Sequence, residues 1–127
     1  MTTTALPHPG LRRLVTAYHG YQYDAFPAAI HHGLPSAELT VVLSFDSALE
    51  MSTLRDPATV SRHWMLAAGL HVEPALIHQR GPQHGIQLGL TPAGARELLG
   101  LPAGALVVRS WLSTICSARP PHACTTR

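Results

Sequence analysis

The sequence predicts a mainly β fold with one short helix near the C-terminal end of the domain. The first observation is the run LTVVLSF at residues 39–45, whose β-branched and aromatic residues favour a strand. The second is the recurrence of glycine and proline between apolar segments, which is typical of turns. The third is Thr91-Pro92, which can cap and begin a helix that Gly100 ends.

Five segments are predicted to form strands, and they are spread over most of the chain. These are residues 13–22, 39–45, 63–70, 75–79 and 86–90. The segment at 39–45 is almost entirely apolar, which predicts burial on both of its faces. In the last segment Ile86, Leu88 and Leu90 share one face, because side chains alternate along a strand.

Three segments between these strands are predicted to be loops or turns. Residues 31–38 (HHGLPSAE) contain glycine and proline, and residues 51–62 are polar with Asp56-Pro57 inside them. Residues 80–85 (RGPQHG) are predicted to form a tight turn.

The predicted helix has one apolar stripe. Ala95, Leu98 and Leu99 stand at positions i, i+3 and i+4, which lie on the same side of a helix. We expect this stripe to pack against the sheet.

The composition is that of an ordinary globular protein of 127 residues, a length suited to one domain. Apolar residues make up 46% of the chain, which argues against disorder throughout. No run approaches the roughly 20 apolar residues of a membrane span, and the first residues carry no export signal. We therefore expect a cytoplasmic protein with no membrane partner.

The charge distribution does not indicate a DNA-binding surface. The formal net charge is only +2, and residues 1–106 carry six arginines against seven carboxylates. Phosphate contacts need a basic stripe, and this part of the chain has none. No DNA-binding residue is predicted in this chain.

Nine histidines raise the hypothesis of a metal site. His31 and His32 are adjacent, and neighbouring side chains on an extended chain point to opposite faces. His71, His78 and His84 could meet across neighbouring strands, but no spaced carboxylate accompanies them. We therefore predict no metal ligands and no cofactor.

No catalytic constellation is recognisable. The serines lie in no GxSxG turn, and no glycine-rich phosphate loop follows a strand. Paired carboxylates for acid–base chemistry are also missing, so we predict no catalytic residues and no enzymatic activity.

Several aromatic and polar side chains could line a ligand pocket. The candidates for ligand binding are Tyr21, His31 and Trp64, and residues of the same kind are Tyr18, Tyr23 and Phe26. The alternative is that all of these side chains fill the core and rim of a small β domain.

Two stretches resemble the N-terminal domain of a group of AraC-type transcriptional regulators common in GC-rich actinobacteria. YHGYQYDAFPAAIHHGLPSAELTVVLSFD, residues 18–46, is similar to the YxGY-like opening, HRGLPS-like turn and LTLVxSLD-like strand of that group. PALIHQRGPQHGIQLGLTPAGARELLGLPAGAL, residues 74–106, is similar to its PxxIxHxGxQxGxQxxLTPxGARxLLGxPAxEL stretch.

The resemblance implies a cupin-like β-barrel or sandwich that senses a small-molecule effector or forms a homodimer. DNA is bound in such regulators by a separate C-terminal part with two helix-turn-helix units, which this chain lacks. Metal-binding cupins show an HxH followed by Glu, and later a PxG motif followed by His. Here Pro92-Ala93-Gly94 is followed by Arg96 and Glu97, so the metal site is not implied.

The resemblance divides the chain into three parts. Residues 1–12 are expected to be a flexible N-terminus, 13–106 the sensor and dimerisation domain, and 107–127 an irregular tail. Relatives continue after residue 106 into an acidic, leucine-rich helix of the LDDLLG type. A two-nucleotide shift in GC-rich codons for the tail can restore that string, so we hypothesise a frameshift near Val107.

The sequence is compatible with three functions. The first is the truncated sensor and dimerisation domain of an AraC-type regulator. The second is a small cupin-type metal-dependent enzyme. The third is a stand-alone interaction protein that forms mixed dimers with a full-length regulator.

Overall fold

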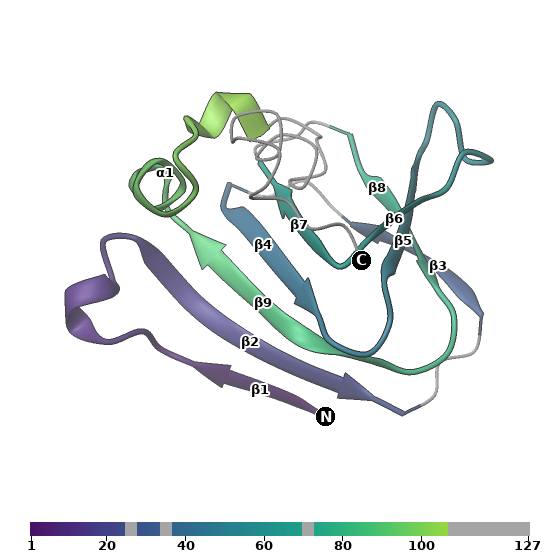
Figure 1. Ribbon diagram of the computed structural model, residues 1–127, viewed down its shortest axis with the longest axis horizontal. Helices are drawn as coiled ribbons and strands as arrows, with labels where there is room; N and C mark the ends of the chain where they lie inside the picture. Colours follow the sequence, from purple (N-terminus) through teal and green to yellow (C-terminus); the bar gives the residue numbers. More distant parts are fainter. Residues whose placement is uncertain (25–27, 34–36, 70–72, 107–127) are drawn as a thin grey trace, which may run out of the picture.

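The computed structural model describes residues 1–24, 28–33, 37–69 and 73–106, and it is a β-sandwich of two antiparallel sheets (Figure 1). The five-stranded sheet has the order β1 (Thr2–Ala5), β2 (Val15–Tyr23), β9 (Gln83–Leu90), β4 (Leu39–Ser44) and β7 (Met65–Ala68). The four-stranded sheet has the order β3 (Ala29–Gly33), β8 (Ala75–Gln79), β5 (Leu49–Thr53) and β6 (Ser61–His63). The predicted mainly β fold is confirmed.

The helical elements are all short. They are η1 (Pro9–Leu11), α1 (Pro92–Gly94), which continues as the single π-helical turn η2 (Ala95–Leu99), and η3 (Ala103–Leu106). Within the described ranges, no helix has the length and apolar character needed to cross a membrane.

Most of the predicted strands are confirmed. Residues 13–22, 39–45 and 75–79 correspond to β2, β4 and β8, and residues 63–70 contain β7. The predicted face of β9 is also confirmed. Its residues Leu88 and Leu90 pair with Val41 and Leu39 of β4, so their apolar side chains share one face of the sheet.

The predicted loops were wrong in three places. Residues 51–62 contribute to β5 and β6, and residues 31–33 belong to β3. The turn predicted at 80–85 ends at residue 82, because β9 begins at Gln83. Each missed strand is short and polar, so its own sequence carries little strand signal. Its extended form depends on pairing with neighbouring strands, β8 above all.

The N-terminus also differs from the expectation of a flexible segment at 1–12. Residues 2–5 form β1, which pairs along the outer edge of β2. The hydroxyl of Thr2 lies 3.1 Å from that of Tyr23, and the hydroxyl of Thr4 lies 3.0 Å from Nδ1 of His19. Polar cross-strand contacts can therefore hold a strand that buries no side chain. The predicted tail at 107–127 and residues 34–36 of the GLPS turn lie outside the described residues.

The apolar core lies on one face of the five-stranded sheet, where the chain leaves β9 for α1. Leu39 is only 1% exposed and is the largest side chain buried so completely. The residues packed there are Leu14, Val15, Leu39, Val41, Ala67, Leu90 and Ala95. Of the predicted helical stripe, Ala95 and Leu99 pack on this core, but Leu98 is 52% exposed. The π-helical turn widens the spacing, so position 98 turns away from the sheet.

The helix begins as predicted. Thr91 is the N-cap, and its hydroxyl accepts a hydrogen bond from the Gly94 N–H at 2.9 Å. The Thr91 backbone N–H donates to the Leu14 carbonyl at 3.0 Å. A Cβ at Gly94 would collide with that same carbonyl, so only glycine lets the helix begin this close to β2. Gly100 ends the helix in the left-handed conformation, with φ at 70°.

A second glycine permits close packing on the other face of the sheet. Gly85 of β9 pairs with Tyr21 of β2 and with Ser44 of β4. A Cβ at Gly85 would collide with the Leu43 carbonyl and the Tyr21 side chain. The Tyr21 ring therefore occupies the space that any other residue at position 85 would need.

Replacement of Leu39 by alanine should lower the free energy of unfolding by about 2–5 kcal/mol, the usual cost of a large-to-small change in a core. The Leu98→Ala variant is the control, because its side chain is largely exposed, and it should change stability by less than about 0.5 kcal/mol. Urea unfolding followed by circular dichroism measures both. Equal effects for the two variants would contradict the assigned core.

Replacement of Gly85 by alanine should destabilise the domain by about 1–3 kcal/mol, because the added methyl group meets a backbone carbonyl that cannot rotate away. Gly104→Ala is the matched control, since nothing lies within 4 Å of a Cβ built there. Thermal unfolding of both variants tests the difference. A Gly85→Ala protein as stable as Gly104→Ala would show that β2, β4 and β9 do not approach this closely.

Candidate functional site

The three residues predicted to bind a ligand lie on different parts of the fold. Tyr21 is half-buried on β2 of the five-stranded sheet, and Trp64, 47% exposed, lies between β6 and β7, where the chain passes from one sheet to the other. The Ser44 N–H donates to the Trp64 carbonyl at 2.9 Å, and the Ser44 side chain shares a face with Tyr21. His31 is exposed on β3 of the other sheet. The structure therefore relates Tyr21 to Trp64 through Ser44 but separates both from His31.

The Tyr21 hydroxyl is buried without a hydrogen-bond partner of good geometry. Burial raises the pKa of Tyr21, and the neighbouring Ser44 hydroxyl partly offsets this by favouring the ionised form. The Ser44 hydroxyl itself donates to the Ser47 carbonyl. These contacts fix the ring against Gly85, and they suit a packing role for Tyr21.

A row of interacting side chains crosses the four-stranded sheet. Strand register pairs Ile30 of β3 with His78 of β8, His78 with Glu50 of β5, and Glu50 with Arg62 of β6. Directly paired residues project from the same face of a sheet. Four strands thus contribute one apolar, one imidazole, one carboxylate and one guanidinium group to a single line.

His78 is the centre of this row and is buried, with 9% of its surface exposed. Its Nε2 lies 2.8 Å from the hydroxyl oxygen of Ser52, which is also buried. Ser52 stands two residues after Glu50 on β5, so it shares the face of His78. The hydrogen bond satisfies one ring nitrogen, and Nδ1 has no partner among the described residues.

The Glu50 carboxylate forms ion pairs with two arginines. Its Oε1 lies 3.0 Å from Nη2 of Arg62, and its Oε2 lies 3.6 Å from Nε of Arg80. The Glu50 side chain is 18% exposed, whereas both arginines extend into solvent. One carboxylate shared between two guanidinium groups leaves a local charge of about +1.

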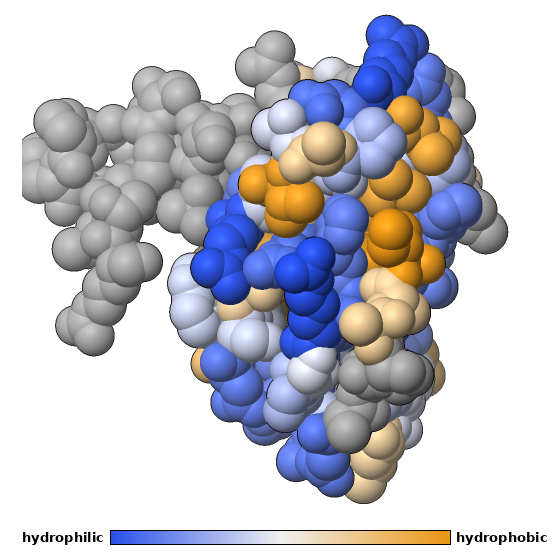
Figure 2. All heavy atoms as spheres, turned by 90° about the vertical axis from the view of Figure 1, so that its right-hand side faces the viewer, coloured by the Kyte–Doolittle hydropathy of each residue, from blue (hydrophilic) through white to orange (hydrophobic). Residues whose placement is uncertain are grey.

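A pocket opens beside this row, between β3 and β8. Its volume is about 230 Å³, and it is lined by Ala28, Ala29, Ile30, His78, Gln79 and Arg80. Gln79 and Arg80, which follow His78 in the sequence, contribute an amide and a guanidinium group. On the side of the molecule that carries the four-stranded sheet, apolar residues interrupt a mostly hydrophilic surface (Figure 2). The pocket therefore has an apolar wall from β3 and the residues just before it, and a polar, positively charged wall from His78, Gln79 and Arg80.

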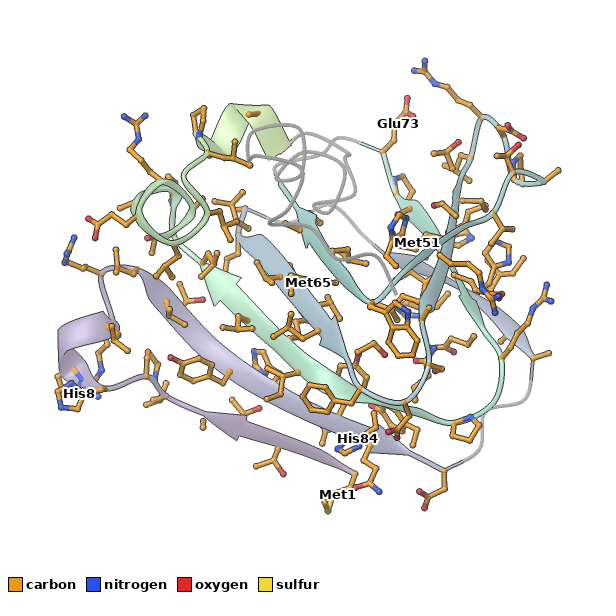
Figure 3. All side chains as sticks on the ribbon, viewed as in Figure 1. Met1, His8, Met51, Met65, Glu73 and His84 are labelled. Carbon is orange, nitrogen blue, oxygen red and sulfur yellow. The ribbon has the colours of Figure 1, made fainter. Side chains whose placement is uncertain are left out.

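The remaining predicted histidines of the described ranges are dispersed, and His71 lies outside those ranges. His31 pairs with Ile77, and His32 pairs with Leu76, so the two adjacent side chains point to opposite faces as predicted. His84 lies on β9, where its Nδ1 is 3.4 Å from Asp46, and it contacts Phe45 edge to face. Figure 3 shows His8 and His84 well apart. Within the described ranges, no three His, Cys, Asp or Glu side chains gather closely enough to hold an ion.

Burial shifts the pKa of one histidine on this sheet. His63 at the end of β6 is partly buried, and this desolvation lowers its pKa below the ordinary value of 6.5. Its Nε2 lies 2.9 Å from the Ser61 hydroxyl. His63 pairs with Leu49 on the opposite face from His78 and Glu50, so it is not part of the pocket.

Sequence reasoning missed the residues of this pocket. The sequence makes His78 a candidate for a metal site only. It contains no motif that marks four further residues as part of a site: Arg80, Ile30, Glu50 and Ser52. The alternation of Leu49 and Met51 with Glu50 and Ser52 was an available signal, since it is the pattern of a strand with one polar face.

No protein-family model, no curated protein and no solved structure significantly matches this chain.

Removal of the Ser52 hydroxyl should destabilise the domain by about 1–3 kcal/mol, because it leaves a buried imidazole nitrogen without its partner. The test is urea unfolding of the Ser52→Ala variant. Thr59→Ala is the matched control, because Thr59 is exposed and its side chain makes no hydrogen bond to a described residue. A Ser52→Ala protein with unchanged stability would show that the Ser52–His78 contact is not formed.

Proposed function

We propose that this chain is the sensor and dimerisation domain of an AraC-type transcriptional regulator, with a cupin-like fold and a small-molecule effector. One observation carries the proposal. The stretch at 74–106, which has the most specific resemblance, folds as one continuous unit of β8, β9 and the helix α1–η2. Its residues Thr91, Pro92 and Gly100 mark the boundaries of that helix.

The position of this unit supports the proposal. β9 is an inner strand of the five-stranded sheet, between β2 and β4. The other resembling stretch, at 18–46, supplies most of β2 and all of β4. The two stretches are thus neighbours in space, which is expected if both belong to one inherited domain.

Under this proposal the chain does not contact DNA directly. The exposed arginines Arg13, Arg55 and Arg62 are each paired with a carboxylate, so they form no continuous basic surface. DNA contact is assigned to the separate helix-turn-helix part of full-length regulators of this type, and dimerisation sets the spacing of their half-sites.

The proposal is tested by joining the chain to a heterologous DNA-binding domain that represses a reporter only as a dimer. We expect the fusion to raise repression by about an order of magnitude over the DNA-binding domain alone, because dimerisation raises the effective concentration at paired half-sites. Sedimentation velocity of the unfused chain should show a dimer at micromolar concentration. Fluorescence anisotropy should show only weak, sequence-independent binding to duplex DNA.

Two outcomes would overturn the proposal. One is a monomer in sedimentation together with no gain in repression. The other is tight, sequence-selective DNA binding by the unfused chain, which would require a DNA-reading surface on the β domain itself.

A further inference from the structure

We propose that the pocket between β3 and β8 binds a small monocarboxylate with a short apolar body. This inference rests on the proposed function, because the carboxylate would be the effector that the sensor domain recognises. The pocket is formed by Ile30, His78, Arg80 and their neighbours at 28, 29 and 79. Its size, its charge and its hydrogen-bonding groups each point to this class of ligand.

The size of the pocket limits the ligand. Pockets for drug-sized molecules have volumes of about 300–1,000 Å³, and this one has a volume of about 230 Å³. A small acid fits, with its apolar part against the Ile30 and alanine side chains.

The charge of the pocket favours an anion. The Nε atom of Arg80 lies 3.6 Å from Oε2 of Glu50, which is beyond hydrogen-bond distance. The Arg80 side chain is 70% exposed. Glu50 is shared with Arg62 at 3.0 Å, so it neutralises Arg80 only in part. The guanidinium N–H groups of Arg80 donate to no described residue. A planar carboxylate can accept two of them at once, the strongest pairing that arginine makes.

His78 provides a second contact from the floor of the pocket. Its Nε2 is occupied by Ser52 at 2.8 Å. When the serine hydroxyl donates to Nε2, the imidazole proton resides on Nδ1, which then becomes a donor. Because His78 is buried by its neighbours and held by Ser52, its ring is fixed before any ligand arrives. An arginine and a positioned imidazole on the same strand segment suit one carboxylate group.

The test is a titration of the full chain with butyrate and with benzoate, followed by amide chemical shifts. Butyramide and benzamide are the neutral controls. We expect saturable shifts for both acids that are largest at residues 28–30 and 78–80, and none for the amides. Arg80→Gln should weaken binding by about tenfold or more, as expected for loss of a bidentate charged pair.

Arg62→Gln is the matched control variant, because Arg62 also pairs with Glu50 and is equally exposed but does not line the pocket. It should bind the acids as well as the wild-type chain or more weakly by less than about threefold, since exposed charges contribute little. Both arginines are in solvent, so both variants should fold, and the amide spectra report this directly. His78→Gln provides a second loss of binding if its spectrum remains dispersed.

Three outcomes would overturn the inference. They are an absence of saturable shifts, equal binding of acids and amides, and equal loss of binding in Arg62→Gln and Arg80→Gln. The result is separable from the regulator proposal. Dimer-dependent repression without acid binding would reject only this pocket, and acid binding at 28–30 and 78–80 without dimerisation would reject only the regulator.

Discussion

The placement of the two sheets depends in part on a short connection with one residue in an unusual backbone conformation. Residues 80–82 join β8, an inner strand of the four-stranded sheet, to β9, an inner strand of the five-stranded sheet. Gly81 has φ at +74°, a conformation that residues with a side chain rarely adopt. The Ser47 hydroxyl donates to the Pro82 carbonyl at 3.2 Å and braces the turn from the β4–β5 connection. Because both flanking strands are inner strands, this geometry contributes to how the two sheets are placed.

The rest of the architecture depends on backbone approach more than on bulky side chains. Gly85 admits the Tyr21 ring beside β9, and Gly94 admits the helix beside Leu14. The fully buried part of the core is small, with Leu39 as its largest side chain. Close approach at these glycines complements a described core built mainly of buried leucine and valine side chains.

This organisation explains which features could be predicted from the sequence. β4, β8, β9 and the helix carry their own signals, either β-branched runs, alternation, or cap residues such as Thr91. β3, β5 and β6 are short and polar, and they become strands through pairing with β8 and with each other. The pocket row could not be predicted, because Ile30, His78, Glu50 and Arg62 come together only through the register of four strands.

The polar row on the four-stranded sheet is hard to explain by stability alone. The ion pairs of Glu50 involve arginines that are largely exposed, and such pairs contribute about 0–1 kcal/mol. Burial of His78 and Ser52 has a desolvation cost that their mutual hydrogen bond only offsets. Apolar residues at these strand positions would build a simpler sheet. What the row does provide is an imidazole held by Ser52 and a guanidinium group that donates no hydrogen bond to any described residue, beside a small cavity at the turn that joins the two sheets. A ligand held there would contact β3, β8 and the connection to β9 at once, so its binding energy would act on the geometry that relates the sheets.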